Sequence, residues 1–146
     1  MKVTFESANL AETEVLIRGD IASPDVAKIL DYIKSLSSTG KKLLLYREDE
    51  QFLVDPCDVV YIEAKENKVE AVTLAGVYGS RKKLYELKEA LSTEPFAQIN
   101  KGTLVNIDFV KSVQAEFSGN YSLRLKSGKE ILTISRKYFK EFKSKI

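Results

Sequence analysis

Short runs of β-forming residues follow one another closely through most of this chain, from residue 41 onward. The runs are rich in Val, Ile, Leu and Tyr, and turn-forming pairs such as Asp55-Pro56, Ala75-Gly76 and Ser127-Gly128 separate them. Runs of this kind between Gly, Pro and Asn residues are typical of strands joined by hairpin turns. The sequence therefore predicts a mainly β module over residues 41–146, α+β overall, with strands at 42–47, 51–54, 59–63, 68–73, 77–78, 110–116, 123–125 and 130–134.

Two helices are expected within this module. Leu84, Leu87 and Leu91 recur at the spacing of one helical face, which predicts a helix over residues 82–91. A second helix is predicted over residues 136–145, with Ser135 in the position of a capping residue. The aromatic residues of this second helix are expected to pack on the sheet.

The first 39 residues have a different pattern. Apolar and polar residues alternate in 3–5 and 15–17, which predicts two short strands. Ser23 and Pro24 then supply a cap and a first residue for an amphipathic helix, and residues 37–40 are expected to be a linker. We interpret residues 1–39 as a small β-β-α unit for dimerisation or regulation, because strand edges and an apolar helix stripe favour self-association.

The composition excludes several classes of protein. The 146 residues contain no histidine, the commonest general base and metal ligand, and the single Cys57 cannot build a structural zinc site. We therefore expect no enzyme, no metal, no cofactor and no small-molecule substrate. No apolar run reaches the roughly 18 residues of a membrane span, and residues 1–6 lack the pattern of a signal peptide, so we expect a cytoplasmic protein.

The positive charge is concentrated at one end of the sequence. The last 23 residues hold eight basic and two acidic side chains, a net of +6, whereas the net charge of the whole chain is +2. This concentration indicates either a solvated terminal helix or a surface that binds phosphates.

Residues 96–106 are the first candidate for a binding surface. Apolar residues at both ends of this segment flank Asn100, Lys101 and Gly102, which we expect at an exposed turn. A firmly held polar and basic turn can contact DNA, and the same residues can also form an ordinary surface loop.

Two basic clusters stand at the starts of the predicted helices. Arg81, Lys82 and Lys83 lie at the start of the helix predicted over residues 82–91, where cations oppose the helix dipole unless an anion approaches. Arg136 and Lys137 open the terminal helix, and the planar fork of an arginine can grip a guanine edge or a phosphate. Both clusters can also be exposed charges without a ligand.

Several of these fragments, taken in order, resemble one family. Residues 58–63 are similar to its strand of acidic, apolar, apolar, aromatic, Ile and Glu residues. Residues 84–91 and 96–106 resemble its central block, and residues 134–139 resemble its C-terminal signature. The family is the LytTR DNA-binding domain of bacterial transcriptional regulators, and the resemblance covers about residues 41–146.

The resemblance implies a sandwich of short antiparallel β-sheets that binds double-stranded DNA in the major groove through loops. The main contact positions of the family fall on Asn67, on Lys101 with Asn100 beside it, and on Arg136. The resemblance also implies sequence-specific transcriptional regulation by a homodimer on paired direct repeats.

The sequence departs from the family pattern in two places and lacks one part. The family often has His at the position of Asn100 and Ser at the position of Gly102. Residues 1–39 are too few for a receiver domain, so the chain is similar to short LytTR regulators, some of which a membrane protein restrains. The alternative that stays open is a protein-interaction module of LytTR-like fold that holds a membrane or protein partner.

Overall fold

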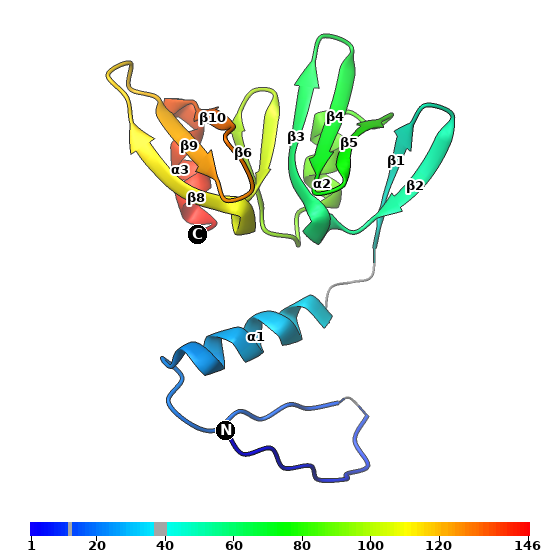
Figure 1. Cartoon of the computed structure of the whole chain (residues 1–146), viewed down its shortest axis with the longest axis vertical. Helices are drawn as coiled ribbons and strands as arrows, with labels where there is room; N and C mark the ends of the chain where they lie inside the picture. Colours follow the sequence, from blue (N-terminus) through cyan, green and yellow to red (C-terminus); the bar gives the residue numbers. More distant parts are fainter. Residues whose placement is uncertain (12, 37–40) are drawn as a thin grey trace. The chain divides into compact units, whose positions relative to one another are not determined.

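A computed structural model describes residues 1–11, 13–36 and 41–146, and it divides the chain into two units, Met1–Gly40 and Lys41–Ile146 (Figure 1). The division falls where the sequence changes from a helical pattern to strand patterns. The predicted linker, residues 37–40, lies outside the described residues.

The described residues of the first unit form one helix, α1 (Pro24–Leu36). The hydroxyl oxygen of Ser23 accepts a hydrogen bond from the Val26 N–H at 3.3 Å, and its carbonyl accepts one from Ala27 at 3.2 Å. The bond to the hydroxyl satisfies an N–H group that the helix itself leaves without a partner, and the bond to the carbonyl is the first of the helix. The predicted helix and its cap are therefore confirmed. Among the described helices, none combines the length and the apolar character needed to cross a membrane.

The two predicted strands of the first unit are wrong. The structure has no strand in residues 1–11 or 13–23, and the side chains of Val3, Phe5 and Val15 are exposed. Alternation of apolar and polar residues gives a strand only where a neighbouring strand and a buried face are available, and an isolated hairpin is marginal in water.

The second unit is built from ten strands in two antiparallel sheets. One sheet has seven strands in the order β2-β1-β5-β4-β3-β7-β6, and the other has three in the order β10-β9-β8. The strands are β1 (Leu43–Arg47), β2 (Glu50–Val54), β3 (Val59–Lys65), β4 (Lys68–Thr73), β5 (Gly76–Ser80), β6 (Phe96–Asn100), β7 (Thr103–Asn106), β8 (Val110–Ala115), β9 (Tyr121–Leu125) and β10 (Ile131–Ile134). The predicted mainly β fold is confirmed.

Helices and short 3-10 turns connect these strands. They are α2 (Leu84–Ala90), α3 (Arg136–Ser144), η1 (Pro56–Asp58) and η2 (Ile107–Phe109). Both helices and every strand predicted after residue 40 are present, with strand ends displaced by at most two residues.

Strands β6 and β7 were not predicted. The sequence suggested an exposed turn between apolar anchors over residues 96–106, and the structure has a hairpin there. All four residues of β7 are buried, including the polar Thr103 and Asn106. A strand buried on both faces has no alternation of apolar and polar residues, so its periodicity does not reveal it.

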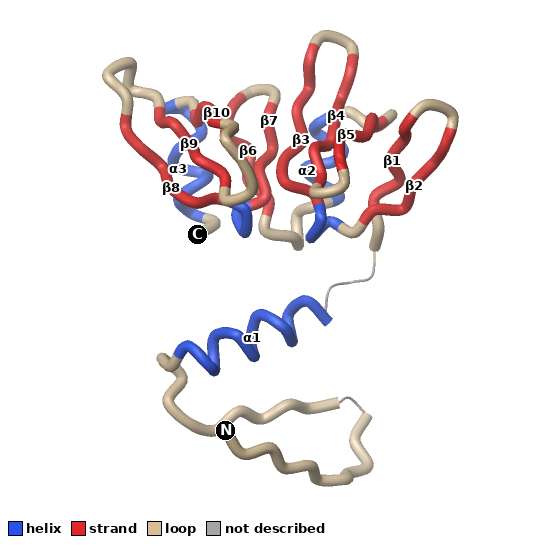
Figure 2. The backbone as a smooth tube through the Cα atoms, viewed as in Figure 1, coloured by secondary structure: helices blue, strands red, loops and turns tan. Residues whose placement is uncertain are grey.

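Two hydrophobic cores hold the second unit together, one on each face of the large sheet. Leu45, Ile62 and Leu104 meet Leu87 of α2 in the first core. The second core lies between the large sheet, the small sheet and α3. Figure 2 shows the strands as two groups, with α2 behind β3 and β4 and α3 behind the small sheet.

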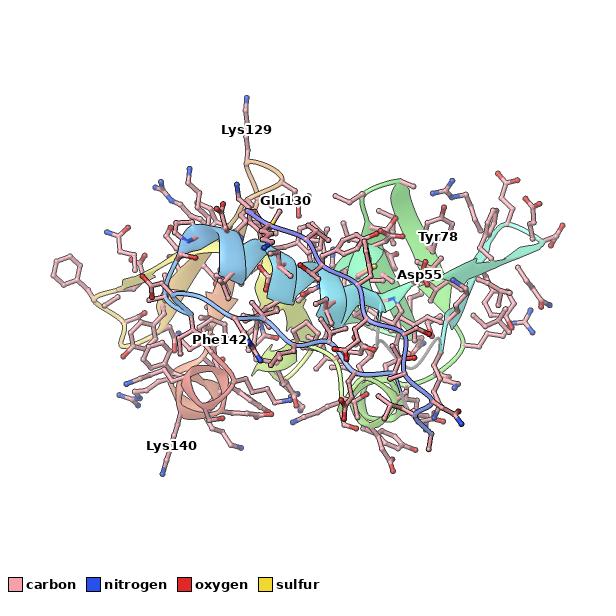
Figure 3. The ribbon with its side chains drawn as sticks, turned by 90° about the horizontal axis from the view of Figure 1, so that it is seen from below. Asp55, Tyr78, Lys129, Glu130, Lys140 and Phe142 are labelled. Carbon is pink, nitrogen blue, oxygen red and sulfur yellow. The ribbon has the colours of Figure 1, made fainter. Side chains whose placement is uncertain are left out.

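Helix α3 is amphipathic and covers the second core. Phe142 is 2% exposed and points toward the sheets, whereas Lys140 points away from them (Figure 3). The expected packing of the aromatic residues is confirmed for Phe142 and Phe139, which lie in or against this core.

A hydrogen bond joins the large sheet to the small one. The hydroxyl of Tyr61 on β3 donates to Glu130 Oε2, in the turn before β10, at 2.6 Å. Burial and then this hydrogen bond raise the pKa of Tyr61 well above its ordinary value. The hydroxyl therefore stays protonated at neutral pH and remains a donor.

Asn106 is a buried polar residue that fixes the end of β7. Its Nδ2 donates to the Val59 carbonyl at 2.9 Å, and its Oδ1 accepts from the Asp108 N–H at 3.0 Å. The side chain is 0% exposed, so water cannot replace either bond. One asparagine thus joins the start of β3 to η2.

Replacing Asn106 should destabilise the fold. Asn106→Ala leaves the Val59 carbonyl and the Asp108 N–H without these partners, and we expect a loss of about 2–4 kcal/mol in the free energy of unfolding. Asn67→Ala, in an exposed turn, is the control and should change it by less than about 0.5 kcal/mol. Urea unfolding of both variants measures the difference, and equal midpoints would contradict the role of Asn106.

Candidate nucleic-acid interface

One end of the second unit gathers all three positions singled out by the family resemblance. It consists of the turns at residues 66–67 and 101–102, the loop at 117–120 and the start of α3 at 135–136, and we call it the loop edge. These segments lie at the upper end of Figure 1. They share this end because β3, β6 and β8 all run toward it and α3 runs away from it.

Backbone hydrogen bonds fix the segments of the loop edge to one another. The Ala64 N–H of β3 donates to the Gly102 carbonyl at 2.7 Å, which joins the turn at 101–102 to the strand that leads to Asn67. The Ser135 N–H donates to the Ile99 carbonyl at 2.8 Å, which joins the start of α3 to β6. The loop edge is therefore a rigid set of turns, as a recognition surface requires.

The side chain of Asn100 stabilises the turn at 101–102 through two hydrogen bonds. Its Nδ2 donates to the Thr133 carbonyl of β10 at 2.9 Å, and its Oδ1 accepts from the Gly102 N–H at 2.9 Å. Both ends of the amide are thus engaged inside the protein. The side chain links the turn at 101–102 to the small sheet, which is a structural role beside the DNA contact that the family resemblance implies.

Gly102 lies where two backbones approach closely. A Cβ atom on this residue would lie 3.1 Å from the Ala64 carbonyl oxygen, which is tighter than an ordinary contact. A serine here would have to push the turn away from β3. The departure from the family pattern at this residue therefore has a local structural reason.

Lys101 and Asn67 occupy the tips of two neighbouring hairpins, and both are exposed. The Lys101 carbonyl accepts a hydrogen bond from Gln98 Nε2 at 3.3 Å, which holds the backbone beneath its side chain. Glu66 has a φ of +51°, so the turn that carries Asn67 is tight. Lys68, which the sequence reasoning did not single out, is exposed immediately after this turn.

Arg136 is exposed at the first position of α3 and lies against the loop at 117–120. Its Nη1 would be 3.4 Å from a Cβ on Gly119, whose φ of +90° also favours glycine. Lys137 follows it, exposed, with its Nζ 5.9 Å from the centre of the Tyr138 ring. The two cations therefore stand together at the loop edge.

The cap of α3 differs from the prediction. Ser135 occupies the capping position, but its side chain makes no capping hydrogen bond. Instead, Asn120 Oδ1 accepts from the Arg136 N–H at 3.1 Å. The contact of Asn120 with a helix sixteen residues later leaves no local signal in the sequence.

Arg81, Lys82 and Lys83 lie between β5 and α2 and are exposed. The guanidinium of Arg81 lies 4.2 Å from the centre of the Tyr46 ring. The Lys83 N–H donates to Glu86 Oε1 at 3.2 Å, so a carboxylate of the protein already accepts a hydrogen bond from the backbone at the start of α2. No contact recorded for the described residues links this cluster to the loop edge, and it forms a separate basic patch.

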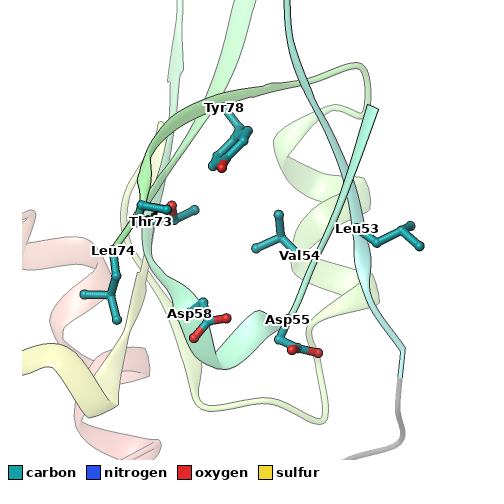
Figure 4. Close-up of a pocket in the computed structure, with 8 residues that line it drawn as sticks. Leu53, Val54, Asp55, Asp58, Thr73, Leu74 and Tyr78 are labelled. Atoms are coloured by element: carbon teal, nitrogen blue, oxygen red, sulfur yellow. Dashed lines mark hydrogen bonds between the residues drawn. The ribbon is translucent and has the colours of Figure 1, made fainter. Parts of the chain in front are cut away.

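An open pocket of about 410 Å³ lies at the start of β3, at the end of the strand away from the loop edge. Figure 4 shows Asp55, Asp58 and Tyr78 among its lining residues. Lys42 Nζ lies 2.5 Å from Asp55 Oδ1, and this hydrogen bond raises the pKa of Lys42. The carboxylate is thus already paired with a cation.

Cys57 lies beside this pocket and is poorly suited to nucleophilic chemistry. Partial desolvation, followed by the nearby Asp58 and Asp55, raises the pKa of the Cys57 thiol. A raised pKa keeps the thiol protonated, whereas reactive cysteines depend on the thiolate. The pocket therefore offers little support for an enzyme.

Comparisons with known proteins show the family of the second unit. The LytTr DNA-binding domain family matches residues 49–146. The sensory transduction protein LytT of Bacillus cereus is 30% identical over 102 residues, which are 70% of this chain and 41% of that protein. The chain thus spans about two fifths of the length of that relative.

A second relative matches over nearly the whole chain. It is an uncharacterized HTH-type transcriptional regulator of Staphylococcus aureus, 25% identical over 142 residues, which are 97% of this chain and 95% of that protein. Among solved structures, a LytTr DNA-binding domain from Bacillus cereus superposes with a TM-score of 0.66 at 21% identity, covering 72% of this chain and 95% of that one. The structural likeness supports the fold, and the family match covers most of the second unit. The chain belongs to the LytTR DNA-binding domain family.

Proposed function

We propose that this chain is a sequence-specific DNA-binding transcriptional regulator that reads the major groove with its loop edge. The main support for the proposal is that Lys101 and Arg136 lie at the same end of the unit, on segments that hydrogen bonds hold in place. Membership in a family named for DNA binding supports it. The Staphylococcus aureus relative, named as a transcriptional regulator, supports the regulatory role.

The roles of the individual side chains follow from their chemistry. Arg136 presents a planar fork to a guanine edge, and Lys101 presents a flexible point charge on the adjoining turn. Asn67 assists from the neighbouring hairpin. Asn100 acts by holding the turn that carries Lys101, and its base contact is secondary to that role.

The remaining basic residues position the DNA backbone. Lys137 stands beside Arg136 and is suited to a flanking phosphate. Arg81, Lys82 and Lys83 form the separate patch before α2, and they contact phosphates farther along a duplex. Because bacterial DNA lies in the cytoplasm, a cytoplasmic location goes with this function.

The first unit supports a homodimer on paired direct repeats. Phe5, Leu16 and Ile21 expose 92%, 75% and 79% of their surface, and Val26 is the one large apolar side chain that its described residues bury. Exposed apolar residues in this number favour association, because burying them removes apolar surface from water. A second copy of the same unit is the partner we propose.

The same apolar residues favour one alternative, a protein-interaction module that holds a membrane or protein partner, such as a membrane-protein inhibitor. A measurement of DNA affinity distinguishes the two functions. A regulator binds a duplex selected from a random pool more tightly than unselected duplex, and both affinities fall steeply with salt. A pure interaction module shows no such selection.

Arg136 should determine base preference. We expect Arg136→Ala to weaken binding to the selected duplex by about 1–3 kcal/mol and to relax the preference at one base position. Lys140→Ala removes the same charge from the outward side of α3 and should leave the preference intact. Selection from a random pool with each variant measures this, and an unchanged preference in Arg136→Ala would remove Arg136 from the recognition site.

Lys82 should act on all DNA alike. Lys82→Ala is expected to weaken binding to selected and unselected duplexes by the same factor, and to lower the slope of log affinity against log salt by about one. Lys111→Ala, at the end of β8 away from the loop edge, is the matched control. Anisotropy titrations at several salt concentrations give both slopes. A slope equal to that of the unmodified protein would show that Lys82 touches no phosphate.

Deleting the first unit should change the mass in solution. We expect the whole chain to be a dimer and a chain lacking residues 1–38 to be a monomer, because the second unit has its own two cores. Light scattering during gel filtration measures both masses. A truncated chain that remains dimeric would place the dimer contact in the second unit instead.

A further inference from the structure

Phe117 is the most exposed large apolar side chain among the described residues, at 112% of its reference surface. It sits on an ordered loop. The Gly119 N–H donates to the Glu116 carbonyl at 3.1 Å, and the Glu116 N–H donates to the Asn120 carbonyl at 2.9 Å. The ring is thus displayed by a hydrogen-bonded hairpin turn.

The loop that carries Phe117 is part of the loop edge. Its Gly119 lies against the Arg136 side chain, and its Asn120 caps the helix that begins with Arg136. Ser118 and Gly119, which follow the ring, are small enough to let the backbone come close to a ligand. The loop that carries Phe117 and the start of α3 therefore form one continuous part of the loop edge.

We propose that Phe117 is a DNA-contacting wedge, which enters the groove beside Arg136 and inserts its ring at a base step. This inference rests on the proposed DNA-binding function and adds a residue and a mode of contact to it. Apolar side chains that enter the minor groove and partly unstack a base step are a recurrent way in which proteins kink DNA. The groove that Phe117 would enter is therefore the minor groove next to the major groove that Arg136 contacts.

The size of the exposed group favours DNA over a protein partner. A single aromatic ring buries roughly 150–250 Å². A stable protein interface needs about 800 Å² on each side. The neighbouring residues of the loop, Glu116, Ser118 and Asn120, are polar, so they do not extend the ring into an apolar patch. A single ring at the tip of a narrow turn is instead suited to insertion between two base pairs.

A wedge also makes a prediction about sequence. Pyrimidine–purine steps unstack more easily than other steps, so the protein should prefer such a step at a position where it makes no hydrogen bond to a base. The preference would depend on Phe117 and be independent of Arg136.

The test compares Phe117→Ala with Phe117→Trp on a duplex that the unmodified protein selects from a random pool. Dyes at the two ends of the duplex report its bend by energy transfer, and anisotropy gives the affinity. We expect Phe117→Ala to lose about tenfold in affinity and most of the bend, and Phe117→Trp to keep both. Leu53→Ala, which removes a side chain 70% exposed on β2, is the matched control and should change neither.

The outcomes separate this inference from the proposed function. If Phe117→Ala binds and bends the duplex normally while Arg136→Ala does not, the wedge is wrong and the DNA-binding function stands. If the unmodified protein selects no duplex, both fail. If Phe117→Ala changes the mass of the protein in solution but not its DNA affinity, Phe117 serves a contact between copies, and the wedge is again wrong. All variants should keep the thermal midpoint of the unmodified protein, because Phe117 is fully exposed.

Discussion

Strand β7 is the element on which the rest of the second unit depends, because it is buried on both faces and paired on both edges. Leu104 faces the core beneath α2, and Val105 faces the core beneath α3. A shift of one residue in its pairing would exchange these two side chains and disrupt both cores. Asn106 fixes one end of the strand, and the bond between Gly102 and Ala64 fixes the other. Because both ends of β7 are fixed, the position of the turn at 101–102 is fixed as well.

Much of this fold could be predicted, since hairpin turns and half-buried strands leave local signals. The errors have physical causes. Strands β6 and β7 lack alternation because both of their faces are covered. The expected strands at 3–5 and 15–17 have alternation but no sheet to join. For the candidate site, local sequence patterns and the family resemblance point to Lys101 and Arg136, and strand direction explains why they share one end. The part played by residues 117–120 depends on a contact with α3 that is distant in sequence.

Asn100 and Gly102 are better understood as a pair than as two separate departures from the family pattern. Asn100 Oδ1 accepts the Gly102 N–H, and the missing side chain of Gly102 lets the turn reach the Ala64 carbonyl. The two residues together hold the basic turn at 101–102 against β3 and β10.

The cap of α3 by Asn120 has a consequence for how this end of the molecule becomes ordered. A helix whose first N–H groups are served by its own capping side chain can form its first turn alone, whereas α3 relies on a side chain from the preceding hairpin. The stacking of Tyr121 on Phe139, with ring centres 3.6 Å apart, adds a second link between the same two segments. The first turn of α3 therefore depends on the hairpin for its cap, and the hairpin and the helix are held together at two points.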